Sequence, residues 1–290
     1  MEYNFVSKKW KKNWDGGWSL LTCSYLSYQY TKQLFEGIGF FVRESLLVSH
    51  NGFSTCYFID EDKKDFGNLV ASKATKNPEV ILEWAQKFKL VTDHILTLIE
   101  DLKAKEASLP NFELFIKGMY DYGVYHRIVK VVVDYLPEDI LKRYLDVLQE
   151  ARLYAEPVYQ ETEKYMQYFA GEIGKKENIK PELILATNKD QFLEYFKTGK
   201  FPLIETLQEQ YENSALYVNE KDEQLVSGKE NISEIEQALI KNNETQELTG
   251  QIAYKGKVQG RVRIILDATK PHEFNEGDIL VTGMTRLLVQ

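Results

Sequence analysis

Cysteine is scarce in this chain, and its scarcity limits the classes of protein to which the chain can belong. Among the 290 residues only Cys23 and Cys56 occur. Two cysteines cannot make the disulfide framework of a small secreted domain, and they supply no cysteine-based zinc pattern. We therefore expect a protein of a reducing compartment, the cytoplasm.

Basic charge and long apolar runs are also lacking. Lys and Arg together number 36 against 44 Asp and Glu, which gives a net charge of -8. A nucleic-acid binder instead needs a basic face for the phosphate backbone. No stretch approaches the roughly 20 consecutive apolar residues of a membrane span. Neither nucleic acid nor a membrane is therefore expected as a partner.

Several motifs of catalysis and nucleotide binding are absent as well. The sequence contains no Gly-x-x-x-x-Gly-Lys-Ser/Thr phosphate loop, no Gly-x-Gly-x-x-Gly after a strand, no Gly-x-Ser-x-Gly elbow and no His-Glu-x-x-His. From its own residues we expect no metal site and no cofactor site in this chain.

What is present divides the chain into four segments. Composition and periodicity predict an aromatic-rich mixed region with a β-hairpin over residues 1–76, a helical bundle over 77–218, a charged linker over 219–247 and a β-rich end over 248–290. The predicted fold class is α+β. Within the linker we expect a hairpin-like turn and then a solvated helix or linker over Glu234 to Lys241. The segment would be either a hinge for the β-rich end or an ordinary connection.

The first segment is rich in tryptophan and tyrosine. Trp10, Trp14 and Trp18 recur at four-residue spacing, which on a helix would place them on one face, although Asp15-Gly16-Gly17 interrupts that helix. These tryptophans would form either an aromatic wall for a ring-shaped or apolar ligand or a small aromatic core.

A tight turn is expected further along the first segment. His50-Asn51-Gly52 separates two apolar runs, Glu44 to Ser49 and Phe53 to Ile59. Asn-Gly supplies the positive φ angles of a hairpin turn, so the pattern predicts a β-hairpin in which His50 is a turn residue.

Three long helices are predicted for the bundle. Asn77 would cap the first, with Pro78 at its first turn and an apolar stripe from Ile81 to Leu102. The second covers Pro110 to Asp134, and the third begins at Pro137 and continues towards Gly171 with a kink near Pro157. Shorter helices follow over Gln191 to Lys197, ended by Gly199, and over Leu203 to Leu216.

His126-Arg127 is the polar pair of the bundle that suggests chemistry. If His126 faces the interior beside Tyr122 and Tyr125, it would bind an acidic ligand or accept a proton. The alternative is a structural pair at the edge of the apolar stripe. For His94, on the preceding helix, we expect an exposed or structural role.

The β-rich end has the most specific pattern. Apolar and polar side chains alternate from Val258 to Ile264, which predicts a half-buried strand, and Gly256 and Gly260 mark a turn or a close backbone approach. Gly277-Asp278 precedes a second apolar strand over Ile279 to Thr282.

Two blocks of this end resemble a known family. The blocks are Gly250-x-x-Ala253-x-x-Gly256-x-Val258-x-Gly260-x-Val262-Arg263 and Gly277-Asp278-Ile279-Leu280-Val281-Thr282-x-x-Thr285. They resemble the opening of the swivelling phosphohistidine domain of PEP-utilising enzymes, which include phosphoenolpyruvate synthase, pyruvate phosphate dikinase and rifampin phosphotransferase. A looser resemblance to the segment preceding that domain covers Leu185 to Gly199. The β-rich end is thus expected to be an incomplete domain of this type.

The resemblance implies phosphoryl transfer. In the family the domain continues into Gly-Gly-x-x-Ser/Thr/Cys-His, whose histidine carries the phosphoryl group, since a neutral imidazole nitrogen is a good nucleophile near pH 7. The printed sequence reaches Gln290 without this segment, and we expect no transfer by these residues alone. ATP and Mg²⁺ are implied for a full family enzyme. The implied partners are a small-molecule phosphoryl acceptor or a separate nucleotide-binding chain.

One site residue follows from the resemblance. Thr285 matches a threonine that hydrogen-bonds the phosphohistidine ring, although Leu287 stands where close relatives have proline. The alternative is a strand-end threonine without a catalytic task. His272, which lies between the two strands, lacks the Gly-Gly context and is expected in a surface loop.

Three hypotheses therefore remain. The leading one is a PEP-utilising, phosphotransferase-like protein or fragment in which the helical part binds or docks the acceptor. The second is a non-catalytic module whose aromatic bundle holds a small apolar ligand or a partner protein. The third is a truncated product with no function of its own.

Overall fold

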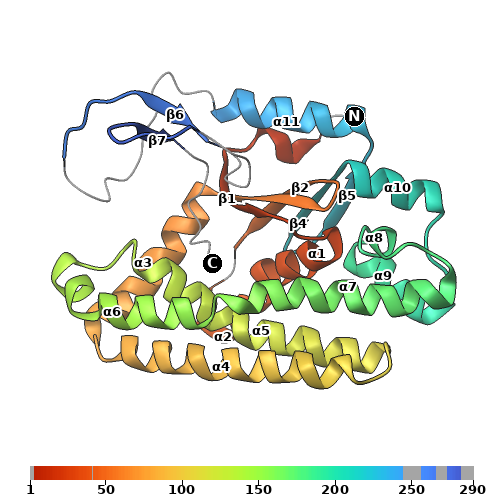
Figure 1. Cartoon of the computed structure of the whole chain (residues 1–290), viewed down its shortest axis with the longest axis horizontal. Coiled ribbons are helices and arrows are strands. Elements are labelled where there is room, and N and C mark those ends of the chain that lie inside the picture. Colours follow the sequence, from red (N-terminus) through yellow and green to blue (C-terminus); the bar gives the residue numbers. More distant parts are fainter. Residues whose placement is uncertain (1–2, 41, 244–255, 266–272, 282–290) are drawn as a thin grey trace. The chain divides into compact units, whose positions relative to one another are not determined.

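A computed structural model describes residues 3–40, 42–243, 256–265 and 273–281. The chain divides into two compact units, Met1–Glu244 and Thr245–Gln290. In the first unit, helices pack on an antiparallel sheet (Figure 1), so the predicted α+β class is confirmed. None of the described helices is long and apolar enough to cross a membrane.

The sheet of the first unit has five strands, all antiparallel to their neighbours. Its order is β1-β3-β2-β4-β5. The strands are β1 Trp10–Gly16, β2 Glu44–His50, β3 Phe53–Ile59, β4 Ser214–Asn219 and β5 Glu223–Ser227. Because β4 pairs directly with β2, the two ends of the unit meet in one sheet.

The predicted hairpin is confirmed. β2 and β3 are joined by Asn51 and Gly52, with φ angles of 50° and 77°, the left-handed values that a two-residue turn requires. His50 pairs with Phe53 at the end of the ladder. His50 does more than occupy the turn, because its Nδ1 lies 3.1 Å from Asn213 Oδ1 and its Nε2 2.9 Å from Glu236 Oε1.

Trp10 and Trp14 lie on a strand, not on a helix. Trp10 is paired with Ile59 and Trp14 with Cys56, and the register shifts between Lys12 and Trp14. Residues four apart on a regular strand share a face, but the bulge adds one residue and reverses the second tryptophan. The four-residue spacing thus does not reflect a helical face, and the two indoles belong to different cores.

The helices follow the predicted order with several differences. Before the bundle come the 3-10 helix η1 Asn4–Ser7, α1 Leu20–Tyr28, the π-helix η2 Gln29–Gln33, α2 Leu34–Ile38 and α3 Asp60–Lys76. The bundle helices are α4 Val80–Lys103, α5 Leu109–Val132, α6 Glu138–Tyr154 and α7 Pro157–Glu177. After them come α8 Pro181–Ile184, α9 Lys189–Thr198, α10 Ile204–Glu212 and α11 Lys229–Asn243.

Three boundaries differ from the prediction. Asn77 does not cap α4; it ends α3, where its N–H donates to the carbonyl of Lys73. The third long helix is two helices, because Pro157 starts a new one at its first turn, where its missing N–H costs nothing. By contrast α9 has the expected limits, with a capping box at Asn188 and Gly199 at φ 70°.

The described part of the predicted charged linker, residues 219–247, is structured. β5 pairs with β4, and α11 buries Ile232, Ile235 and Leu239 against the sheet. The predicted helix over Leu203 to Leu216 also ends early, at Glu212, and β4 follows. The division near residue 244 lies close to the predicted start of the β-rich end at 248.

The two faces of the sheet carry two separate cores. On one face α11 and η1 cover a small core (Figure 1), whose buried members are Tyr3, Phe5, Trp10, Leu46, Val48, Ala215, Tyr217, Val226, Ile232, Ile235 and Leu239. On the other face the larger core extends through α1, α5, α4 and α7.

The second unit contains a short parallel pair in its described part. β6 Val262–Ile264 pairs with β7 Ile279–Val281. β7 begins where a strand was predicted, whereas β6 covers only the last three residues of the stretch from Val258 to Ile264 that was predicted as a strand. Gly260 permits the close approach expected of it, because a Cβ there would lie 2.2 Å from the carbonyl oxygen of Gly277. The predicted half-burial is reversed, however. Val262 and Ile264 are exposed, and Arg263 is the less exposed residue, with its Nε 3.2 Å from Asp278 Oδ2.

Candidate functional site

The predicted site residues have different outcomes. Thr285 and His272 lie outside the described residues. Trp10, Trp14 and Trp18 do not form one wall, although Trp14 and Trp18 remain neighbours with ring centroids 6.3 Å apart. His94 is exposed. The pair His126-Arg127 lies within a group of aromatic and basic side chains, and the candidate site is built on it.

His126 lies on α5 among aromatic rings. Its ring stacks on Tyr122 at 5.5 Å and meets the edge of Tyr159 at 4.9 Å, while Nδ1 lies 2.9 Å from the Tyr159 hydroxyl. Burial, together with the positive charges of Lys130 and Arg152, holds the pKa of His126 well below its usual value. The neutral ring therefore accepts a hydrogen bond from the Tyr159 hydroxyl. Tyr125, the other tyrosine expected beside it, instead lies under Lys87.

Arg127 is buried without a carboxylate. Its side chain is 6% exposed, its Cζ lies 3.9 Å above the ring of Tyr30, and its Nε has no hydrogen-bond partner. Burial lowers the pKa of Arg127, and the neighbouring Tyr159 hydroxyl partly offsets this. The Tyr30 hydroxyl is also buried and unpartnered. A guanidinium removed from water normally has a negative partner, and none of the ion pairs among the described residues gives Arg127 one.

Lys130 lies one turn after Arg127 on the same face of α5. Burial lowers its pKa to about 8, and the nearby charges of Arg127, Arg152 and Lys63 contribute to the shift. Arg127, Lys130 and Arg152, here called the cationic cluster, make no ion pair with any carboxylate in the part of the chain that the structure describes. Three positive groups without a counter-charge favour a negatively charged ligand.

Aromatic rings form a wall next to the cationic cluster. Trp18 meets the edge of Tyr159 at 5.0 Å, and Tyr159 meets the edge of Tyr122 at 5.8 Å. Trp18 comes from the segment before α1, Tyr122 from α5 and Tyr159 from α7. The wall therefore depends on three elements that are distant in sequence.

A glycine on α5 allows the π-helix η2 to come close to it. Gly123 lies on α5 one turn before Arg127, and a Cβ there would lie 2.0 Å from Nε2 of Gln29 in the π-helix η2. Gln29 donates from that nitrogen to the carbonyl of Tyr120 at 3.0 Å. Only glycine permits this approach, and the next residue of η2, Tyr30, is thereby placed under the Arg127 guanidinium.

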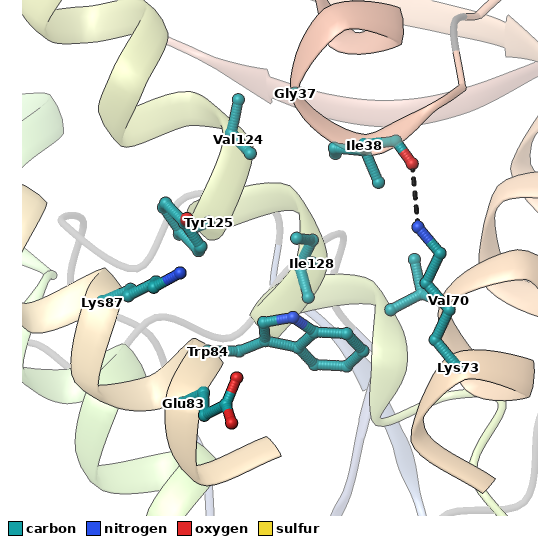
Figure 2. Close-up of a pocket in the computed structure, with 10 residues that line it drawn as sticks. All are labelled: Gly37, Ile38, Val70, Lys73, Glu83, Trp84, Lys87, Val124, Tyr125 and Ile128. Atoms are coloured by element: carbon teal, nitrogen blue, oxygen red, sulfur yellow. Dashed lines mark hydrogen bonds between the residues drawn. The ribbon is translucent and has the colours of Figure 1, made fainter. Parts of the chain in front are cut away.

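A hollow lies on another side of α5. It encloses about 120 Å³ between α2, α3, α4 and α5 (Figure 2). The ammonium of Lys73 is turned to the carbonyl of Ile38, to which it donates at 3.0 Å, and Glu83 and Lys87 line the hollow from α4. No buried polar atom without a partner is found among its lining residues.

Metal binding has no support in the described part of the chain, where no group of three His, Cys, Asp or Glu side chains is placed to hold an ion. Comparisons with protein-family models, curated proteins and solved structures found no match for this chain. The resemblance to PEP-utilising enzymes accordingly rests on the two sequence blocks alone.

Sequence reasoning found the centre of the candidate site but not its surroundings. His126 and Arg127 were singled out, whereas Lys130, Tyr30 and Tyr159 were not. One available signal was the i, i+3 spacing of Arg127 and Lys130, which puts two cations on one face of an otherwise apolar helix. The contacts from η2 and α7 have no sequence signal, because they depend on tertiary packing.

Proposed function

We propose that the first unit binds a small anionic molecule at the cationic cluster. We also propose that it serves as the acceptor-binding part of a phosphoryl-transfer protein similar to the PEP-utilising enzymes. The observation that carries the proposal is the buried Arg127 guanidinium, which has a free Nε and no carboxylate beside it. Arginine suits phosphate and carboxylate groups because its planar fork donates two parallel hydrogen bonds.

The second unit supports the phosphoryl-transfer part of the proposal. Its strands β6 and β7 pair with each other and, in the described residues, do not extend the five-stranded sheet, as a separately moving domain requires. The two sequence blocks that resemble the swivelling domain include both strands. The phosphoryl donor would come from a separate nucleotide-binding module or chain, which would bring its own ATP and Mg²⁺.

Anion binding is tested by thermal unfolding with inorganic phosphate, phosphoenolpyruvate and phenyl phosphate. We expect each probe to raise the Tm of the wild-type protein, because a ligand at 100 times its Kd stabilises by about 2.7 kcal/mol. Arg127→Met should remove the response. The matched control is Arg143→Met, since Arg143 is exposed and pairs with Glu79 on another helix. If Arg127→Met does not fold, Lys130→Gln replaces it in the test. Lys130 is partly exposed, and its loss should weaken the rise in Tm.

The alternative function is a non-catalytic module that holds an apolar ligand against the aromatic wall of Trp18, Tyr159 and Tyr122. Benzyl alcohol, which has a ring but no charge, distinguishes binding of an apolar ligand from binding of an anion. Equal stabilisation by benzyl alcohol and phenyl phosphate would favour the alternative and contradict anion binding.

Phosphoryl transfer is tested with labelled ATP or phosphoenolpyruvate. We expect no acid-labile label on this chain by itself, because His272 lacks the sequence context of the family's phosphohistidine. Label on His272 would overturn the assignment of the carrier residue.

A further inference from the structure

The hollow between α2, α3, α4 and α5 has a largely apolar lining. It encloses about 120 Å³, the space of about four water molecules at roughly 30 Å³ each. Its apolar lining comes from all four helices (Figure 2) and consists of Ile38, Val70, Trp84, Val124 and Ile128. Since an apolar cavity of roughly 150 Å³ holds benzene, this hollow has room for an apolar group of about three to five carbon atoms.

Two contacts fix α2 where it borders the hollow. A Cβ at Gly37 would lie 2.7 Å from Cγ2 of Val124, so the glycine lets α2 approach α5 here. Lys73, on α3, donates from its Nζ to the carbonyl of Ile38, the last residue of α2, at 3.0 Å. An ammonium group is favourable at the end of a helix. Lys73 therefore has a structural task, but its charge has no carboxylate partner among the described residues.

α4 contributes two donors that have no acceptor in the described part of the chain. The Trp84 side chain is 8% exposed and its Nε1 makes no hydrogen bond there, but unlike Nε1 of Trp14 it is not sealed from water. Lys87 follows three residues later, on the same face of the helix. Its Nζ lies 5.9 Å from the centre of the Tyr125 ring and forms no ion pair with a described carboxylate, not even with Glu83 one turn before it.

The charges of the lining favour a singly charged anion. Lys73 and Lys87 bring two positive charges, and Glu83 brings one negative charge. A ligand that complements this lining has one negative acceptor group and a short apolar body. A carboxylate meets the requirement, because its oxygens accept hydrogen bonds from an ammonium and from an indole N–H. A doubly charged phosphate fits less well, because Glu83 repels it.

We propose that the hollow is a second binding site, and that it takes a short-chain monocarboxylate. The alkyl chain packs against Ile38, Val70 and Ile128, and the carboxylate accepts hydrogen bonds from Lys87 and from the Trp84 indole. The site goes beyond the anion binding proposed above, since none of its lining residues belongs to the cationic cluster or to the aromatic wall. The alternative is a packing gap that holds only water.

The indole N–H signals test the proposal by NMR. The chain has four tryptophans, so a proton–nitrogen correlation spectrum holds four such signals, and Trp84→Phe assigns that of Trp84. We expect butyrate to shift this signal in a saturable way. Acetate should bind about tenfold more weakly, because it lacks two CH₂ groups that the hollow buries. Butan-1-ol should also bind about tenfold more weakly, because it has the chain but no charge.

Lys87→Met separates the role of the charge from that of the chain. The variant keeps a long apolar side chain and removes the ammonium. Its affinity for butyrate should fall about tenfold, while its affinity for butan-1-ol stays within about twofold of the wild type. The matched control is Lys117→Met, because Lys117 lies on α5 outside the lining. Both positions are exposed, so both variants should fold.

Several outcomes would overturn the proposal. It fails if butyrate does not shift the Trp84 signal in a saturable way, or if it shifts the Trp18 signal instead, which would place butyrate at the aromatic wall. It also fails if Lys87→Met keeps its affinity for butyrate or if Lys117→Met loses as much. Anion binding at the cationic cluster is judged separately, by the response of Arg127→Met to phosphate, so either proposal can fail without the other.

Discussion

The two faces of the five-stranded sheet differ in how their polar atoms are satisfied. On the face covered by α11, the Trp10 indole donates to the carbonyl of Phe5 at 2.7 Å, and the Tyr217 hydroxyl accepts from Asn219 at 3.0 Å. On the face covered by the bundle, the Trp14 indole, the Tyr30 hydroxyl and Arg127 Nε have no partner. A folded protein leaves few buried polar atoms unpaired, and each one needs an explanation.

The polar groups of the α11 face are satisfied within the protein, and the unpaired ones on the bundle face are the reason for which we propose a ligand there. Poor packing does not explain the unpaired atoms, because the same face buries fully packed side chains such as Phe112, Phe115 and Phe192. In a binding site, polar groups that are unpaired in the free protein find their partners on the ligand. The loss of stability that they cause is offset by interactions in the rest of the protein.

The largest change in the free energy of unfolding is expected for a substitution on the α11 face. Ile235 is 0% exposed and Ile240, on the same helix, is 64% exposed. Ile235→Ala should lower the free energy of unfolding by about 2–5 kcal/mol, because it leaves a cavity. Ile240→Ala should change it by less than about 0.5 kcal/mol. Urea unfolding followed by circular dichroism measures both. Equal small effects would show that α11 is the loosely attached linker predicted from its composition.

The α11 prediction also shows where sequence reasoning stopped. Local signals sufficed for the β2–β3 hairpin, with its Asn51-Gly52 turn, and for α9, with its capping box and terminal glycine. They failed for β4, which pairs with β2 far away in sequence. They also failed for the packing of α11 against the sheet, since only a solvated helix or linker was expected there. The high charge of residues 219–247 concealed the few apolar positions that α11 buries.

Prediction of the candidate site from the sequence was limited in the same way. His126-Arg127 was found because polar residues within an apolar helix are locally visible. Tyr30 and Tyr159 reach the pair only through the close approach of η2 at Gly123 and the packing of α7. Neither contact has a local pattern, and the bulge in β1 that separates Trp10 from Trp14 is equally hidden.

The second prediction concerns the pH dependence of stability on the bundle face. The pKa of Glu163 rises from 4.5 to about 7 on folding, so the folded state holds this proton more tightly than the unfolded state does. The resulting stabilisation is fully present below about pH 4.5 and is lost as the pH rises through 7, with a total of about 3 kcal/mol. Glu163→Gln should remove this part of the pH dependence, as measured by urea unfolding between pH 4.5 and 8. A difference between the two proteins that does not vary with pH would contradict the shift.

The third prediction compares the two tryptophans of β1 directly. Trp10→Phe should cost about 1–3 kcal/mol, because the carbonyl of Phe5 loses its 2.7 Å hydrogen bond and keeps only the longer one, of 3.4 Å, from the N–H of Lys8. Trp14→Phe removes an N–H that has no partner and should cost less than Trp10→Phe by about 1 kcal/mol. Circular dichroism is the suitable probe, since both substitutions alter tryptophan fluorescence. Equal costs would show that the two faces do not differ in hydrogen bonding at this strand.

The smallest expected effect is a proton taken up at Lys130 when an anion binds. Its pKa is about 8 in the free protein, because of burial and the neighbouring positive charges, and a bound phosphate would raise it again. At pH 9 phosphate binding should therefore take up a fraction of a proton, which calorimetry in two buffers of different ionisation enthalpy measures. Lys130→Gln should lose the uptake, and the control Lys117→Gln, at an exposed position of the same helix, should keep it. Binding without proton uptake would place the anion away from Lys130, and the bundle face would then need another explanation for its unpaired groups.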